Sequence, residues 1–150
     1  MMSYEIRAEE VEFRPLALIR MIARPEDLAT VVPRACGEVW EAVKKAGIAN
    51  PGRLVAIYLD DAIHLEVGVE ISGSVPPNCG VVASVIPAGV VAWTTHIGPY
   101  QRLGDAHDAI ASWCEQNGHE RAGPNWEING HGSDDPAQIR TDVFHLLKGS

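Results

Sequence analysis

The stretch of residues 87–129 changes its hydrophobic pattern three times. Residues 90–96 form an apolar run rich in β-branched residues, which predicts a strand. A turn of glycine and proline follows, and then apolar residues recur at spacings of three and four, which predicts an amphipathic helix through Leu103, Ala106, Ile110 and Trp113. Asn117 and Gly118 are predicted to end that helix.

Residues 125–129 predict a returning strand. Because side chains alternate along a strand, Trp126 and Ile128 are expected on one side and Glu127 on the other. On pattern alone, a charged residue in such a strand is most simply a carboxylate on a solvated sheet face. A role in a ligand site is the alternative.

The first half of the chain predicts a similar series of elements. Residues 4–23 predict extended structure that bends at Arg14 and Pro15, since proline cannot donate to a strand ladder. Pro25 opens a helical region, and Pro33 is predicted to restart it as a second, longer helix. The apolar face of this helix is predicted to hold Cys36, Val39, Val43 and Ala46, with Gly47 as its end. Residues 54–59 and 63–71 predict two strands with a polar corner at 60–61, and residues 72–80 predict a loop.

The two halves match when one is shifted along the other. A single offset places Gly47 on Gly118, Val39 on Ile110 and Tyr58 on Asn129, which is a shift of 71 residues (118 − 47). We therefore predict an α+β fold of two strand–helix–strand–strand repeats, approximately residues 4–71 and 80–147, related by pseudo-twofold symmetry. Two main helices on one face of a shared antiparallel sheet are expected to leave a ligand groove between them.

Composition limits the classes of protein that remain. A chain of 150 residues with 46% apolar composition fits a single domain, residues 1–150, around one core. A net charge of −8 argues against direct nucleic-acid binding, which draws on clustered Lys and Arg. No apolar run is long enough to cross a bilayer, and the N-terminus does not have the pattern of a signal peptide. Together with three scattered cysteines (Cys36, Cys79 and Cys114), this predicts a cytoplasmic protein without a membrane partner.

The histidines do not predict a metal site. His96, His107, His119 and His131 lack the i,i+4 or H-x-H spacings that place two imidazoles around one ion, even with Asp105 or Asp135 nearby. His96 is expected instead to bond local backbone at the Gly98 corner. No nucleophile motif or phosphate-binding loop is present, so neither a metal nor a cofactor is predicted.

The order and spacing of several short motifs resemble those of the GyrI-like effector-binding domains, over nearly the whole chain. The motifs are residues 87–89, His96 with Gly98, Pro99 and Tyr100, residues 126–128, residues 135–136 with 140–142, and in the first half residues 53–61 and 65–69. The resemblance implies a two-repeat α+β fold with a hydrophobic, aromatic-lined cleft, and an acidic residue, here Glu127, at its base. Asn129 stands where the family usually has tyrosine.

The resemblance further implies a function. In this family the cleft receives bulky, often cationic or planar, drug-like compounds, and this chain looks like the stand-alone type. Non-catalytic binding of amphipathic, aromatic or cationic small molecules, in xenobiotic sensing or sequestration, is therefore the favoured hypothesis. The ligand-binding candidates are Glu127, Tyr58, Trp40, Trp93, Tyr100 and Trp126. From the pattern alone, Tyr58 and the tryptophans fit core packing as well, and Tyr100 fits either a pocket wall or a staple at the helix entrance.

Two alternatives remain open. The first is a hydrolase of electrophilic, cyclopropane-type toxins on the same scaffold, with Glu127 as general acid or water-orienting base and Tyr58 or Tyr100 assisting. The second is a protein-interaction module that modulates DNA gyrase or a transcription regulator. The partner expected in the favoured case is a hydrophobic or cationic small molecule.

Overall fold

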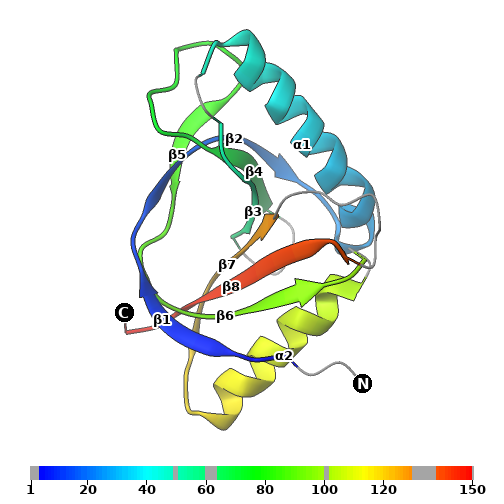
Figure 1. Cartoon of the computed structure of the whole chain (residues 1–150), viewed down its shortest axis with the longest axis vertical. Coiled ribbons are helices and arrows are strands. Elements are labelled where there is room, and N and C mark those ends of the chain that lie inside the picture. Colours follow the sequence, from blue (N-terminus) through cyan, green and yellow to red (C-terminus); the bar gives the residue numbers. More distant parts are fainter. Residues whose placement is uncertain (1–3, 49–50, 60–63, 100–101, 130–137, 150) are drawn as a thin grey trace. The chain divides into compact units, whose positions relative to one another are not determined.

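The chain forms two compact units. The computed structural model describes residues 4–48, 51–59, 64–99, 102–129 and 138–149, without the side chains of residues 25, 28 and 29. One unit spans residues 13–87, and the other joins residues 1–12 to residues 88–150. We call them the 13–87 unit and the 88–150 unit (Figure 1).

The 13–87 unit is a four-stranded antiparallel sheet with one long helix. Its elements are β2 (Arg14–Ile22), the short 3-10 helix η1 (Pro25–Asp27), α1 (Leu28–Lys45), β3 (Leu54–Tyr58), β4 (His64–Glu70) and β5 (Val82–Ile86). The strands lie in the order β3-β4-β2-β5. The strands predicted at residues 54–59 and 63–71 are therefore present with slightly different ends.

The helical region of this unit differs from its prediction. Pro33 lies inside a single helix that already begins at Leu28, so the predicted restart at Pro33 is wrong. As the sixth residue of an 18-residue helix, Pro33 removes one backbone hydrogen bond and crowds the carbonyl four residues before it, a cost that the packing of the long apolar face offsets. The buried face of the helix also differs from the predicted one. Val39 and Val43 are buried as predicted, but Val32 and Ala35 complete the face, and the predicted Cys36 and Ala46 are only half-buried.

The edge strand β5 was not predicted from the pattern. It pairs with β2, and Val82 and Val85 remain about half exposed. A strand with exposed apolar residues on both faces has no alternation for a sequence pattern to detect.

The 88–150 unit is also a four-stranded antiparallel sheet with one helix. Its elements are β1 (Arg7–Val11), β6 (Gly89–Ile97), α2 (Leu103–Gln116), β7 (Arg121–Asn129) and β8 (Arg140–Leu147). The strands lie in the order β1-β6-β8-β7. The chain passes from β1 to β2 at residues 12–13, so the break lies just before the bend predicted at Arg14 and Pro15, which are the first two residues of β2. The N-terminal segment thereby contributes one strand to each unit.

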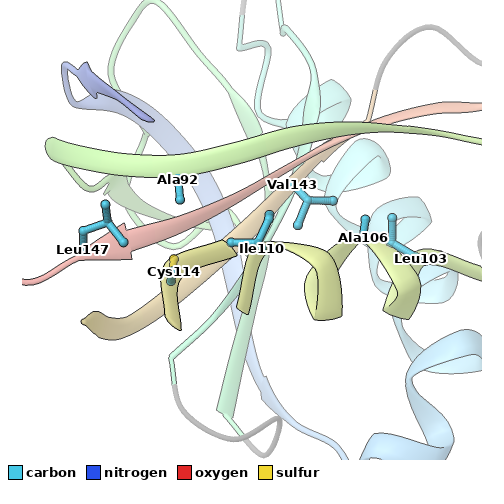
Figure 2. Packing of buried hydrophobic residues seen from close by; sticks show 7 residues of the cluster. All are labelled: Ala92, Leu103, Ala106, Ile110, Cys114, Val143 and Leu147. Atoms are coloured by element: carbon cyan, nitrogen blue, oxygen red, sulfur yellow. The ribbon is translucent and has the colours of Figure 1, made fainter. Parts of the chain in front are cut away.

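One face of α2 closes the core of this unit. Figure 2 shows four side chains of the helix directed toward β6 and β8, and the cluster they form consists of Leu103, Ala106, Ile110, Cys114, Ala92, Val143 and Leu147. Trp113 packs against the cluster from the side. Gly118 has φ +71°, a conformation that side chains disfavour, and it ends the helix as predicted.

Both units thus contain an antiparallel sheet and a helix, and the α+β class is confirmed. Apart from the edge strands β1 and β5, the order along each unit is strand, helix, strand, strand, and the third of these strands pairs with both of the others. The pseudo-twofold relation between the halves, the single-domain organisation and the groove between the helices stay predictions. None of the helices in the described residues is long and apolar enough to cross a membrane.

Candidate functional site

Glu127 lies on the face of its sheet that α2 covers. It is paired with Val143 on the neighbouring strand, and directly paired residues point to the same face. Val143 belongs to the cluster under α2, and Glu127 is only 3% exposed. Burying a carboxylate costs several kcal/mol unless it is hydrogen-bonded, so its partners decide what the site can do.

Two histidines continue from Glu127 in a hydrogen-bonded chain. His107 Nε2 lies 2.7 Å from Glu127 Oε2, and His107 Nδ1 lies 2.8 Å from His145 Nε2. The helix places His107 four residues after Leu103, on its sheet-facing side. The strand β8 places His145 two residues after Val143, on the same face as Glu127. We call these three residues the Glu–His–His chain.

The terminal histidine of this chain is electrically neutral at neutral pH. Burial, together with the charges of His107 and Arg121, lowers the pKa of His145 to about 3. His145 therefore carries one ring N–H. Its Nε2 either accepts a hydrogen bond from His107 Nδ1–H or donates one to a bare His107 Nδ1.

The chain has one member in contact with solvent. The side chain of His107 is 22% exposed, compared with 5% for Glu127. Protons can therefore enter and leave through His107, while the carboxylate remains screened from water. This arrangement supplies a buried carboxyl group and a route for a proton, which are features of a cation site and of a general acid or base.

The two predicted tryptophans of this unit lie on the opposite face of the sheet. Trp93 and Trp126 both stack on Phe144, with ring centroids 5.4 and 5.8 Å apart. Arg7 lies over the Trp93 ring at 5.9 Å, which extends the row across all four strands. The structure thus brings Trp93 and Trp126 together through Phe144 and separates both from Glu127 by the thickness of the sheet.

The remaining predicted site residues are placed as follows. Tyr58 is buried on β3, and Trp40 is 37% exposed on α1, both in the 13–87 unit. Tyr100 lies outside the described residues. Whether these side chains meet Glu127 at one site stays a prediction.

His96 is a separate buried group. Its Nε2–H donates to the backbone oxygen of Pro99 at 3.2 Å, which confirms the predicted bond to local backbone. Since Nε2 carries the proton, Nδ1 is the acceptor for the Tyr4 hydroxyl at 2.9 Å. The described residues contain no group of three or more His, Cys, Asp or Glu side chains that could hold a metal ion.

The partnership of Glu127 with His107 and His145 was missed at the level of sequence. The available signals were a histidine inside the apolar stripe of a helix and another at an inward position of a strand. Neither signal indicates which acid the histidines meet, because residues 107, 127 and 145 come from three different elements.

The sequence matches one family model over nearly its whole length. A family model described as the GyrI-like small molecule binding domain matches residues 4–148. No curated protein matches the sequence significantly.

Several solved structures share the fold. The C-terminal domain of EcmrR has a TM-score of 0.82 at 18% identity, with 99% of this chain and 100% of that chain covered. EcmrR in a complex with DNA gives 0.78 at 18% identity, covering 98% of this chain and 58% of that one. SAV2435 bound to tetraphenylphosphonium gives 0.65 at 10% identity, covering 99% and 95%. A hydrolase from Listeria innocua gives 0.64 at 10% identity, covering 96% and 92%. At these identities the likeness shows the fold alone.

Proposed function

Since this chain belongs to the GyrI-like small molecule binding domain family, we propose that it binds amphipathic cations with aromatic groups. Glu127 provides the negative charge at the base of their site. The biological role that follows is sensing or sequestration of xenobiotic compounds.

The burial of Glu127 is the observation that carries this proposal. At 3% exposure, the carboxylate is screened from water, and its interaction with a nearby cation is stronger than at a surface. The similar fold of SAV2435, which was solved with the lipophilic cation tetraphenylphosphonium, gives the ligand class further support. The net charge of −8 favours the approach of cations over anions.

The sequence repeat supports a finer proposal about the ligand site. We propose that the two halves are related by a pseudo-twofold axis and that the ligand binds in a hydrophobic groove between α1 and α2. Glu127 and Tyr58 contribute polar contacts, and the exposed ring of Trp40 provides apolar area. Tyr100, Trp93 and Trp126 complete the proposed set. Because Trp93 and Trp126 stack on Phe144 on the opposite face of the sheet, both act on the site indirectly, by holding the strands that carry it.

Calorimetric titration with tetraphenylphosphonium tests the role of Glu127. We expect Glu127→Gln to raise the Kd about tenfold or more, since a tenfold change corresponds to ~1.4 kcal/mol and a buried charge partner contributes at least this much. The uncharged analogue triphenylphosphine oxide should lose no affinity in the same variant.

Glu66 provides the matched control. It is also buried, at 7% exposure, but lies on β4 and accepts a hydrogen bond from Arg20 at 2.7 Å. Glu66→Gln should leave the Kd for tetraphenylphosphonium unchanged. Equal affinity of wild type and Glu127→Gln would refute the proposed site.

The Glu–His–His chain favours hydrolysis as a second candidate function. A carboxylate hydrogen-bonded to a histidine is able to activate water or to protonate a leaving group. If the protein opens electrophilic cyclopropane compounds, mass spectrometry should show a product with one added water. Glu127→Gln should abolish turnover while a bound substrate is still detected. Turnover that persists in Glu127→Gln would exclude Glu127 as the catalytic group.

A further inference from the structure

His107 occupies the position at Glu127 where a positive charge is most favoured. Its Nε2 lies 2.7 Å from the carboxylate, within the range of a charge-assisted hydrogen bond. Its side chain is 22% exposed, so it exchanges protons with solvent. A protonated His107 and an ionised Glu127 form a pair with no net charge beneath α2.

We infer that His107 is the resident counter-ion of Glu127 and that a cationic ligand replaces its charge, so that cation binding releases a proton from the protein. This inference rests on the proposed function and adds a specificity-determining role for His107. The ligand class is a permanently charged organic cation, such as a phosphonium or a quaternary ammonium compound.

Electrostatics supply the reason for proton release. A ligand cation that binds beside an ionised Glu127 and a protonated His107 leaves one excess positive charge in a region shielded from water. Uncompensated charge in such a region is costly, and loss of one proton from His107 restores neutrality. A neutral ligand creates no excess charge and releases no proton.

His145 allows His107 to hold either charge without losing a hydrogen bond. When His107 is protonated, its Nδ1–H donates to His145 Nε2, 2.8 Å away, and the proton of His145 is on Nδ1. When His107 is neutral, with its remaining proton directed at Glu127, His145 carries its proton on Nε2 and donates to His107 Nδ1. Since burial holds the pKa of His145 near 3, His145 does not itself take up charge in this range.

The other ionisable groups of the described residues around this chain have separate roles. On β7, the charge of Arg121 acts on His145. On β6, His96 is engaged by Tyr4 and Pro99. On α2, Asp105 pairs with Arg102, and Asp108 is exposed to solvent. His107 is thus the histidine of this face that both contacts Glu127 and reaches solvent.

Proton release is measured directly by calorimetry. Tetraphenylphosphonium does not titrate, so its binding enthalpy, measured in two buffers of different ionisation enthalpy, gives the number of protons exchanged by the protein. Histidine changes its charge between about pH 5 and pH 8. At the acidic end of this range we expect cation binding to release up to about one proton. As the pH rises from there, the Kd should fall by up to about tenfold per pH unit and then become constant once His107 is neutral before binding.

Variants assign the proton to His107. Glutamine keeps a neutral hydrogen-bonding side chain, so His107→Gln should bind the cation without proton release and with a Kd independent of pH. His119→Gln is the matched control, because His119 is exposed and stacks on Trp113, which is not part of the Glu–His–His chain. It should behave as wild type.

The outcomes separate this inference from the proposed function. Binding that depends on Glu127 but shows no proton exchange and a constant Kd in wild type would overturn the inference and leave the proposed function standing. Retention of proton release in His107→Gln would also overturn it. If wild type does not bind tetraphenylphosphonium at any pH, both fail. The wild-type measurement decides even if His107→Gln does not fold.

Discussion

Among the described residues, two sets of hydrogen-bonded side chains hold the buried acid and the buried histidines that face α2. Glu127, His107 and His145 form one set, and His96 with Tyr4 forms the other. A buried polar group without a partner costs about 1–3 kcal/mol, so mutual pairing is what makes these side chains tolerable beneath a helix. At the scale of residues, stability and the proposed chemistry therefore depend on the same contacts.

The lowered pKa of His145 makes stability depend on pH. Its pKa is about 3 in the folded chain and about 6.5 when unfolded, so the unfolded state binds more protons between these values. The contribution is complete above about pH 6.5 and is lost as the pH falls toward 3. Between about pH 7.5 and pH 5, we expect wild type to lose about 2 kcal/mol more unfolding free energy than His145→Gln. Urea unfolding at the two pH values measures this difference.

His119→Gln again serves as the control for that measurement. His119 is exposed, so its removal should leave the dependence on pH as in wild type. Glu70 also lowers stability in acid, because hydrogen bonds from Arg53 and Arg14 outweigh the effect of burial and lower its pKa. That contribution is common to all three proteins and cancels. Parallel curves for wild type and His145→Gln would contradict the assignment.

At the scale of elements, the position where α2 ends depends on the glycine at residue 118, just as its packing depends on its apolar face. Gly118 has φ +71°, and no atom lies within 4 Å of the place where its Cβ would be. The requirement for glycine is therefore conformational and not steric. Gly37 offers the opposite case, because it lies inside α1, has helical φ, and also has open space around it.

These two glycines give a paired prediction. Gly118→Ala should destabilise the protein by about 1 kcal/mol, since an alanine is strained at this φ. Gly37→Ala should stabilise it by about 0.5–1 kcal/mol, because alanine loses less backbone freedom in a helix. Thermal unfolding of both variants measures the two signs, and destabilisation in both would show that local strain is not the cause.

At the scale of the whole molecule, the chain is divided by strand pairing and not by simple sequence halves. Residues 7–11 pair with β6 in the 88–150 unit, whereas residues 14–22 pair with β4 and β5 in the 13–87 unit. Phe13, at the change between the two, is 62% exposed. The first part of the chain thus supplies the edge strand β1 to the 88–150 unit, and residues 82–86 supply the edge strand β5 to the 13–87 unit.

This organisation keeps the Glu–His–His chain within one unit. Its three residues come from α2, β7 and β8, which all belong to the 88–150 unit. The charge chemistry proposed for cation binding is therefore a property of that unit, while Tyr58 and Trp40 are contributions proposed from the other.

The sequence by itself determined the elements with strong periodicity. The helix from Leu103, its end at Gly118 and the alternation of Trp126 with Glu127 follow from local spacing, which neighbouring residues impose on one another. The family resemblance, carried by ordered motifs, is also confirmed. The pattern also singles out Glu127 as the lone carboxylate of a short strand.

Only the tertiary structure decided what Glu127 meets. His107 and His145 are separated from it by 20 and 18 residues, and their approach depends on how α2 crosses the sheet and how β8 pairs with β7. Local patterns contain no information about such contacts, because they arise from packing between elements. For the same reason the sequence did not reveal the weakly patterned edge strand β5, or that Pro33 is accommodated within a helix.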